Sequence, residues 1–238
     1  MDDLPREILQ ARVKLMLGEP YLASAIARFP VVNAHAMDWC DTMATDGYYI
    51  YVNPVFYEDL SSSEMSFVFA HEVMHCILGH IDRRGTRNPD LWNQAIDYAT
   101  NLMLVELGLK MPKSGLLDRC YRGMTAEDIY RRLVDKTKDQ KVKGGAAQSS
   151  GGAGTQPAPS GWDLHLSPSD IRGQATRARE FPSAEERQRL RITLTNSMSS
   201  KLRSVAPGLF KSEIRQARGG DVPWRTIVSR FFTGLRRD

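Results

Sequence analysis

The chain has 238 residues, a formal net charge of +4 at pH 7 and 42% hydrophobic residues, a composition typical of a soluble globular protein with one domain, or one domain and a tail. It contains no apolar run of membrane-spanning length, and its acidic start lacks the basic and apolar regions of a secretion signal, so we expect neither membrane insertion nor export. Its three cysteines, Cys40, Cys76 and Cys120, form no C-x-x-C pair, which excludes a disulfide framework and a structural zinc finger and favours a reducing cytoplasm.

The beginning of the chain predicts two helices and a β-hairpin. Apolar residues at helical spacing cover residues 5–18 and 21–28. Two runs rich in β-forming residues follow, at residues 39–45 and 48–52. The Asp-Gly pair between these runs is a strong hairpin signal.

A helical pattern that contains His-Glu-x-x-His follows the hairpin. Ser61 and Glu64 have the spacing of a capping box, which satisfies the first free N–H groups of a helix. Because each helical residue turns the chain by about 100°, His71 and His75 lie one turn apart on the same face. Two imidazoles placed in this way can bind one zinc ion, and Glu72 beside them can take a proton from a zinc-bound water. This is the arrangement of a zinc metallopeptidase.

The alternative is an ordinary helix that carries two solvated or hydrogen-bonded histidines. Apolar residues on both sides of the motif, however, predict that the helix is buried: Phe67, Val68, Phe69, Ala70, Val73, Ile77 and Leu78. Burying Glu72 beside two histidines without a metal ion would cost much free energy. We therefore interpret the motif as a zinc site.

Two residues compete to be the third ligand of that site, because a catalytic zinc ion has three protein ligands and one open position. His80 is close in sequence, but if the helix continues it points about 180° away from His71. Asp97 lies on the next predicted helix, at residues 90–107. Helix geometry favours Asp97 over His80.

A polar stripe on that second helix supports the choice of Asp97. Asn93, Asp97 and Asn101 recur every four residues on an otherwise apolar helix. Polar side chains on a buried face need partners. A zinc ion would be the partner of Asp97, and the two amides could form hydrogen bonds that orient the other ligands. The alternative is a salt bridge between Asp97 and Arg83 or Arg84.

The second half of the chain changes in composition. After a capped helix that begins near Thr125, residues 136–160 are rich in Lys, Gly, Ala, Ser, Gln and Pro and predict a flexible linker or insertion. Residues 161–238 predict a basic segment with helices at 183–203, 209–217 and 227–232. This segment would pack on the preceding domain or extend it.

Nucleic-acid binding through this basic tail is a less favoured possibility. Residues 175–238 contain fourteen Lys and Arg against six Asp and Glu, a surplus that could contact phosphates. The tail shows no base-reading motif, so we prefer to interpret the charges as solvated helix faces.

Several spaced motifs together resemble a family of predicted bacterial and phage metallopeptidase domains. They cover most of residues 5–135, and the resemblance resumes at residues 206–209 and 222–225. The motifs are Thr45-Asp46-Gly47, Asn53-Pro54, His71-Glu72-Val73-Met74-His75, His80, Arg83-Arg84, Trp92-Asn93 with Ala95, Asp97 and Asn101, and Ala126-Glu127-Asp128-Ile129-Tyr130.

The resemblance implies an α+β, zincin-like fold in residues 1–135: a motif helix packed on a small sheet, and a second helix that offers an acidic ligand. In a zincin the strand before the motif helix forms the rim of the cleft, where an extended peptide can add as a further strand. That strand would be residues 48–52 or its hairpin partner. Simple cross-strand packing is the favoured explanation for the tyrosines there.

The resemblance also implies partners. Many members precede a von Willebrand factor A-like domain, and their genes often neighbour an AAA-type ATPase. We therefore predict a cytoplasmic zinc-dependent peptidase that acts on a peptide or protein, with His71, His75 and Asp97 as ligands and Glu72 as the base. The alternative is a non-catalytic zincin-like module that binds an ATPase or an A-like protein.

Overall fold

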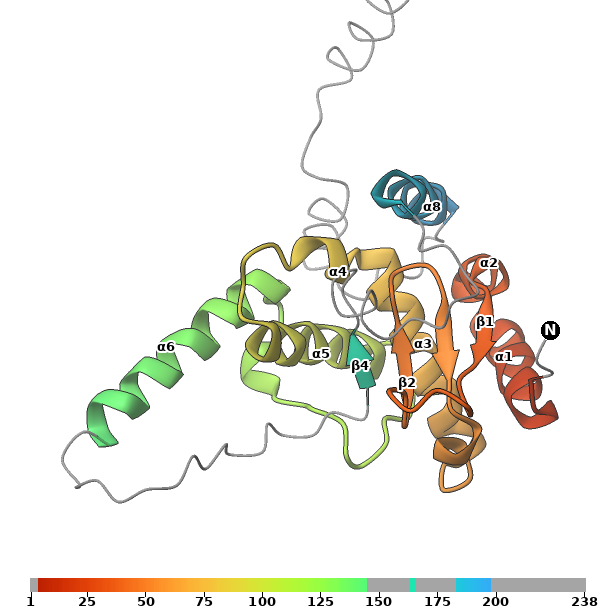
Figure 1. The fold of residues 1–238 in the computed structure, drawn as a ribbon, viewed down its shortest axis with the longest axis horizontal. Coiled ribbons are helices and arrows are strands. Elements are labelled where there is room, and N and C mark those ends of the chain that lie inside the picture. The colour runs from red at the N-terminus through yellow and green to blue at the C-terminus, as the bar shows by residue number, and fades with distance from the viewer. Residues whose placement is uncertain (1–3, 145–162, 166–182, 198–238) are drawn as a thin grey trace, which may run out of the picture.

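The structure is a computed structural model that describes residues 4–144, 163–165 and 183–197 (Figure 1). Helices dominate the described residues, and four short strands form one mixed sheet. The predicted α+β class is thus confirmed, whereas the zincin-like character stays a prediction. No helix within these ranges has the length and apolar content needed to cross a membrane.

The two N-terminal helices form where the sequence predicts them. Helix α1 spans Arg6–Gly18 and α2 spans Pro20–Arg28, with Pro20 at the first turn of α2, where its missing N–H costs nothing. Both helices pack against the central helix α3 (Ser62–Leu78). Arg12 ties them together, because its guanidinium donates to the carbonyl oxygen of Ile26 at 2.8 Å, near the end of α2.

The sheet has the order β1-β3-β2-β4, with strands β1 (Val31–Asn33), β2 (Met43–Thr45), β3 (Ile50–Val52) and β4 (Asp163–His165). Strands β2 and β3 are antiparallel, with Thr45 opposite Ile50, so the predicted hairpin is confirmed. Strand β1 runs parallel to β3, and β4 runs parallel to β2.

The hairpin turn depends on Asp46 and Gly47. One carboxylate oxygen of Asp46 accepts hydrogen bonds from the N–H groups of Tyr48 (2.8 Å) and Tyr49 (2.7 Å). The other oxygen accepts from the Tyr51 hydroxyl at 2.9 Å. Gly47 has φ of 89°, a left-handed conformation that favours glycine.

The strand order corrects the expected site of peptide addition. Strand β3 lies between β1 and β2, and β2 lies between β3 and β4. Both strands of the hairpin therefore have a neighbouring strand on each side. Their backbone N–H and C=O groups pair with those neighbours and do not form an open edge. A peptide cannot add beside β3, and beside β2 it would have to replace β4.

Helix α3 is the centre of the fold. Its predicted capping box is present: the Ser61 N–H donates to the Glu64 carboxylate at 3.0 Å, and the Glu64 N–H donates to the Ser61 hydroxyl at 3.4 Å. Every residue from Phe67 to Leu78 is buried. The helix ends at Gly79, whose φ of 65° is left-handed.

The remaining elements are helical. A 3₁₀ turn, η1 (Pro54–Tyr57), precedes α3, and a second, η2 (Arg119–Tyr121), precedes α6. Between them lie α4 (His80–Arg83) and α5 (Pro89–Glu106), and α5 packs against both α3 and α6.

Helix α6 (Ala126–Gly144) is longer than the sequence predicts. It extends well into residues 136–160, which we expected to be linker, and Figure 1 shows its far end projecting from the body. The physical reason is that residues 136–143 contain no Gly or Pro, and their Lys and Gln residues have good helix propensity. The rest of the expected linker lies outside the described residues.

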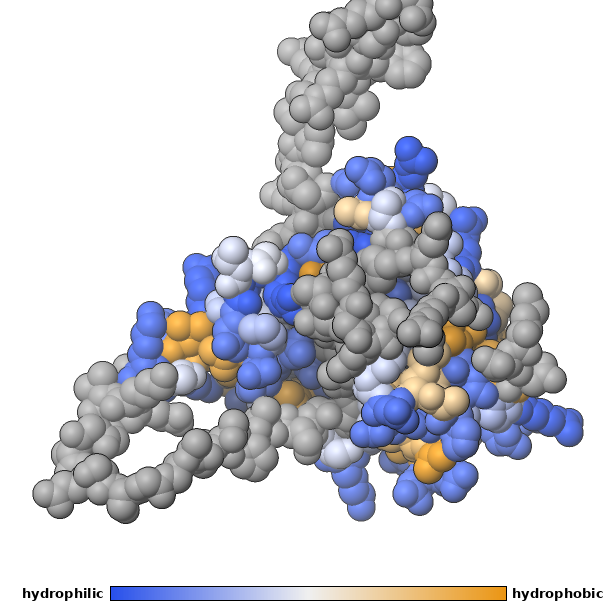
Figure 2. All heavy atoms as spheres, viewed as in Figure 1, coloured by the Kyte–Doolittle hydropathy of each residue, from blue (hydrophilic) through white to orange (hydrophobic). Residues whose placement is uncertain are grey.

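Helix α8 (Ala184–Ser197) corresponds to the predicted helix at 183–203, whose last residues, like the two later predicted helices, lie outside the described ranges. It packs against α3 and α2, and Leu194 joins the main core. Figure 2 shows mostly hydrophilic side chains over α8, as expected for its solvent side.

An ion-pair cluster attaches α8 to α4, in which the shared Asp82 side chain is 23% exposed. Arg187 donates from Nε to Asp82 at 3.1 Å, and Arg191 also donates to the Asp82 carboxylate. The Arg187 side chain is 5% exposed and that of Arg191 is 11% exposed. Asp82 is therefore the counter-charge of two largely buried guanidinium groups. We call Asp82, Arg187 and Arg191 the Asp82 cluster.

We predict that Asp82→Ala lowers the free energy of unfolding by about 2 kcal/mol, because it removes the carboxylate to which two largely buried guanidinium groups donate. The control is Arg122→Ala, which removes an ion pair with Glu106 whose arginine is 74% exposed and should cost less than about 1 kcal/mol. Urea denaturation of both variants measures the difference. If both variants lost the same small amount of free energy of unfolding, the Asp82 cluster would not stabilise the fold as we predict.

The Asp82 cluster also predicts a pH dependence. Burial alone would raise the pKa of Asp82, but hydrogen bonds and charges from Arg187 and Arg191 outweigh burial and lower it below its ordinary value. The unfolded chain therefore binds the proton at higher pH than the folded chain. The difference in stability between wild type and Asp82→Ala should be full above about pH 4 and shrink as the pH falls further. Urea titrations at a series of acidic pH values measure this.

Candidate metal centre

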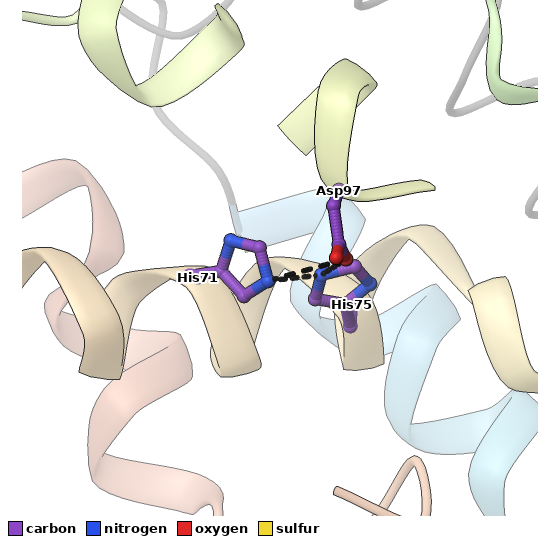
Figure 3. A group of neighbouring side chains, drawn as sticks. All are labelled: His71, His75 and Asp97. Atoms are coloured by element: carbon purple, nitrogen blue, oxygen red, sulfur yellow. Dashed lines mark hydrogen bonds and ion pairs between the residues drawn. The ribbon is translucent and has the colours of Figure 1, made fainter. Parts of the chain in front are cut away.

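Three side chains converge in the space between α3 and α5 (Figure 3). Nε2 of His71 and Nε2 of His75 each lie 3.7 Å from Oδ1 of Asp97. The two ring nitrogens are 2.6 Å apart. All three residues are buried: both histidines are 0% exposed and Asp97 is 5% exposed. The structure thus brings together the three ligands expected from the sequence.

The chemistry of these donors fits a metal ion. Two imidazole nitrogens and one carboxylate oxygen form a donor set used by catalytic zinc sites. Nε2 of His71 and Nε2 of His75 are 2.6 Å apart, so a bound metal ion would take the place of the proton between them. All candidate donor atoms lie within 4.8 Å of one another, so one ion could reach each of them.

Asn101 fixes the protonation of His71. Its Nδ2 donates to the carbonyl oxygen of Leu116 at 2.9 Å, so its Oδ1 is the atom that faces Nδ1 of His71 at 2.7 Å. An amide oxygen only accepts hydrogen bonds, so His71 carries its proton on Nδ1. In the neutral ring this leaves the lone pair on Nε2, toward Asp97. Asn101 of the polar stripe therefore contacts a predicted ligand, as expected. Asn93, the first residue of the stripe, is only partly buried.

His80 lies beside His75 without joining the three donors. Its Nδ1 is 2.8 Å from Nδ1 of His75, the ring nitrogen that faces away from Asp97. His80 would point away from His71 only in a continuous helix, whereas α3 ends at Gly79 and the chain turns back there. Asp97, rather than His80, faces both Nε2 atoms.

Glu72 is buried, and Cys40 and Tyr57 lie close enough to feel its charge. The Glu72 residue is 0% exposed. Burial first, and the charge of Glu72 second, raise the pKa of Cys40 to about 12 and the pKa of Tyr57 well above its ordinary value. Tyr57 itself donates to the sulfur of Met43. A carboxylate in such surroundings has a low-dielectric environment, in which proton transfer is sensitive to nearby charge.

Arg83 pairs with Glu127. It donates to the Glu127 carboxylate at 2.6 Å and to the carbonyl oxygen of Leu78 at 3.0 Å, so it connects the end of α3 to the first turn of α6.

Sequence reasoning missed two neighbours of the site, Tyr57 and Trp92. Tyr57 lies near Glu72, and Trp92 donates from Nε1 to the carbonyl oxygen of His80 at 3.0 Å. Trp92 belongs to one of the motifs named above, but in the sequence it is only an apolar position of its helix, and Tyr57 belongs to no motif. Only the packing of α3 against its neighbours brings them to the site.

Comparison with known proteins gives one match. A family model described as "Putative metallopeptidase domain" matches residues 4–238. No curated protein and no solved structure matches the chain. The match agrees with the resemblance seen in the sequence and supports a peptidase class with a bound metal. The expected ATPase, A-like and nucleic-acid partners and the cytoplasmic location remain predictions.

Added metal should raise the thermal stability of the protein. The three donors converge only in the folded chain, so the metal binds the folded chain and not the unfolded one. At a free zinc concentration of one hundred times Kd, the stabilisation is about 2.7 kcal/mol. For a chain of this size that corresponds to an increase in Tm of about 5–10 °C. Thermal unfolding followed by circular dichroism, with zinc or with chelator, measures the shift. Asp97→Ala should remove most of it, and an unchanged shift in that variant would contradict the role of Asp97.

Proposed function

The chain belongs to this family of metallopeptidase domains, and we propose that it is a zinc-dependent peptidase. In this proposal His71, His75 and Asp97 hold the zinc ion, and Glu72 is the general base. The observation that carries the proposal is the convergence of two imidazoles and one carboxylate on a single buried point, one residue away from a buried glutamate.

The proposed chemistry divides the work between the ion and the protein. Bound zinc would supply a water of lowered pKa and polarise the peptide carbonyl. Glu72 takes a proton from the attacking water and delivers it to the nitrogen of the leaving amine, as one carboxylate can act first as a base and then as an acid. Asn101 holds His71 in the tautomer that offers its Nε2 lone pair, and burial of these side chains strengthens each of these interactions.

The number of donors favours catalysis over a purely structural metal. Among the described residues, the group of potential ligands has three members, His71, His75 and Asp97. Structural zinc sites use four protein ligands, whereas catalytic sites keep one position for water or substrate. The geometry of His80, which faces the far nitrogen of His75, supports the open arrangement.

We propose an extended peptide segment as the substrate. Strands β1 and β4 are the outer strands of the described sheet, and β4 is the one that neighbours β2, the strand in contact with α3. A peptide that pairs with the sheet near the metal centre would therefore add beside β4 or take its place beside β2.

We predict that Glu72→Gln retains about one zinc ion per chain and loses peptide hydrolysis by a factor of about 10²–10⁴, because the amide cannot accept the proton. Elemental mass spectrometry measures the zinc content, and release of fluorescent fragments from labelled casein measures the activity. Glu58→Gln, a change at an exposed position, is the matched control and should alter neither. Wild-type activity in Glu72→Gln would show that the mechanism is wrong, and a folded wild type that takes up no zinc would show that the metal assignment is wrong.

A further inference from the structure

The position of His80 depends on a break in the helix. Gly79 has φ of 65°, so the chain leaves α3 and restarts as α4 at His80. In a continuous helix, five residues of separation would place His75 and His80 about 140° apart. The left-handed glycine instead turns the His80 ring toward His75, with 2.8 Å between their Nδ1 atoms. Both rings are 0% exposed, so this contact is made without competition from bulk water.

The contact between these two nitrogens admits only two proton arrangements in neutral rings. A hydrogen bond between ring nitrogens needs one N–H group and one lone pair. If His80 donates, the proton of His75 sits on Nε2, toward Asp97, where it blocks a metal. If His75 donates from Nδ1, its Nε2 offers a lone pair toward Asp97, and the proton of His80 sits on its own Nε2. Zinc binding requires the second arrangement, because the ion must replace the proton that lies between Nε2 of His75 and Nε2 of His71, 2.6 Å apart.

We propose that His80 is a positioning residue that accepts the Nδ1 proton of His75 and thereby holds His75 in its metal-binding tautomer. It plays for His75 the part that Asn101 plays for His71. Groups that accept the second N–H of a metal-bound histidine fix its tautomer and orientation and strengthen it as a ligand. The inference rests on the proposed zinc site but not on peptide hydrolysis.

Helix α5 anchors His80 in this role. The Trp92 indole donates from Nε1 to the carbonyl oxygen of His80 at 3.0 Å, and the two rings meet edge to face with centroids 6.4 Å apart. Trp92 is 1% exposed, so its hydrogen bond is protected. The same helix carries Asp97 and Asn101. One element thus presents a ligand, orients the first histidine directly and orients the second through His80.

The test compares zinc affinity in two variants, measured by competition with a chromophoric chelator. His80→Phe keeps a ring but removes the acceptor, and we expect a Kd for zinc 10–100 times higher with about one zinc ion still bound at saturation. His80→Asn keeps an acceptor oxygen within reach of His75 Nδ1 and should remain within a few-fold of wild type. His35→Phe, at an exposed histidine, is the matched control and should leave the affinity unchanged.

Three results of this comparison would overturn the inference. Wild-type affinity in His80→Phe would show that the contact does not matter. Complete loss of zinc in both variants, as in His75→Ala, would make His80 a ligand instead. A wild-type protein that binds no zinc would remove the proposed site and this inference together, whereas normal zinc binding without peptidase activity would leave the inference standing.

A second measurement on wild type does not depend on the folding of any variant. Long-range proton–nitrogen NMR spectra of the zinc-loaded, ¹⁵N-histidine-labelled protein report the tautomer of each ring. We expect His71 and His75 to be protonated on Nδ1 and His80 to be protonated on Nε2. A proton on Nδ1 of His80 would contradict the proposal.

Discussion

Polar side chains buried between α3 and α5 are the constraint on which this structure depends. Histidines and carboxylates taken out of water are stable only when each is hydrogen bonded, paired or bound to a metal. Here the partners come from opposite helices, since His71 and His75 of α3 face Asp97 and Asn101 of α5. The two helices must therefore pack in one axial register, because a slip of one residue would leave several polar groups unpaired at once.

The local signals at the helix ends serve that register. The capping box at Ser61 fixes where α3 begins, Gly79 fixes where it ends, and Asn88 caps the start of α5 through the N–H of Leu91. Residues 79–88, which include α4, connect the two helices, so these boundaries help to determine which turn of α5 lies opposite the motif. Arg83 reinforces the arrangement by binding both the end of α3 and Glu127.

The parts of the fold that were predictable from the sequence are those specified by neighbouring residues. The hairpin followed from Asp46-Gly47, α3 from its cap and apolar run, and Asp97 from the four-residue spacing of a polar stripe. Features that depend on tertiary context were missed. His80 was assessed on a continuous helix, whereas a glycine in the left-handed region redirects it. The pairing of β4 with β2 joins segments far apart in sequence, and no local pattern indicates such a partner.

The Asp82 cluster makes α4 and α8 depend on one another although they are remote in sequence. Asp82 and Arg187 are 105 residues apart, and their contact joins the short helix that begins at His80 to a helix that packs on α3. The carboxylate that makes this contact lies two residues after His80. A disturbance of α8 would therefore reach the end of α3 beside the candidate metal centre, through a single side chain.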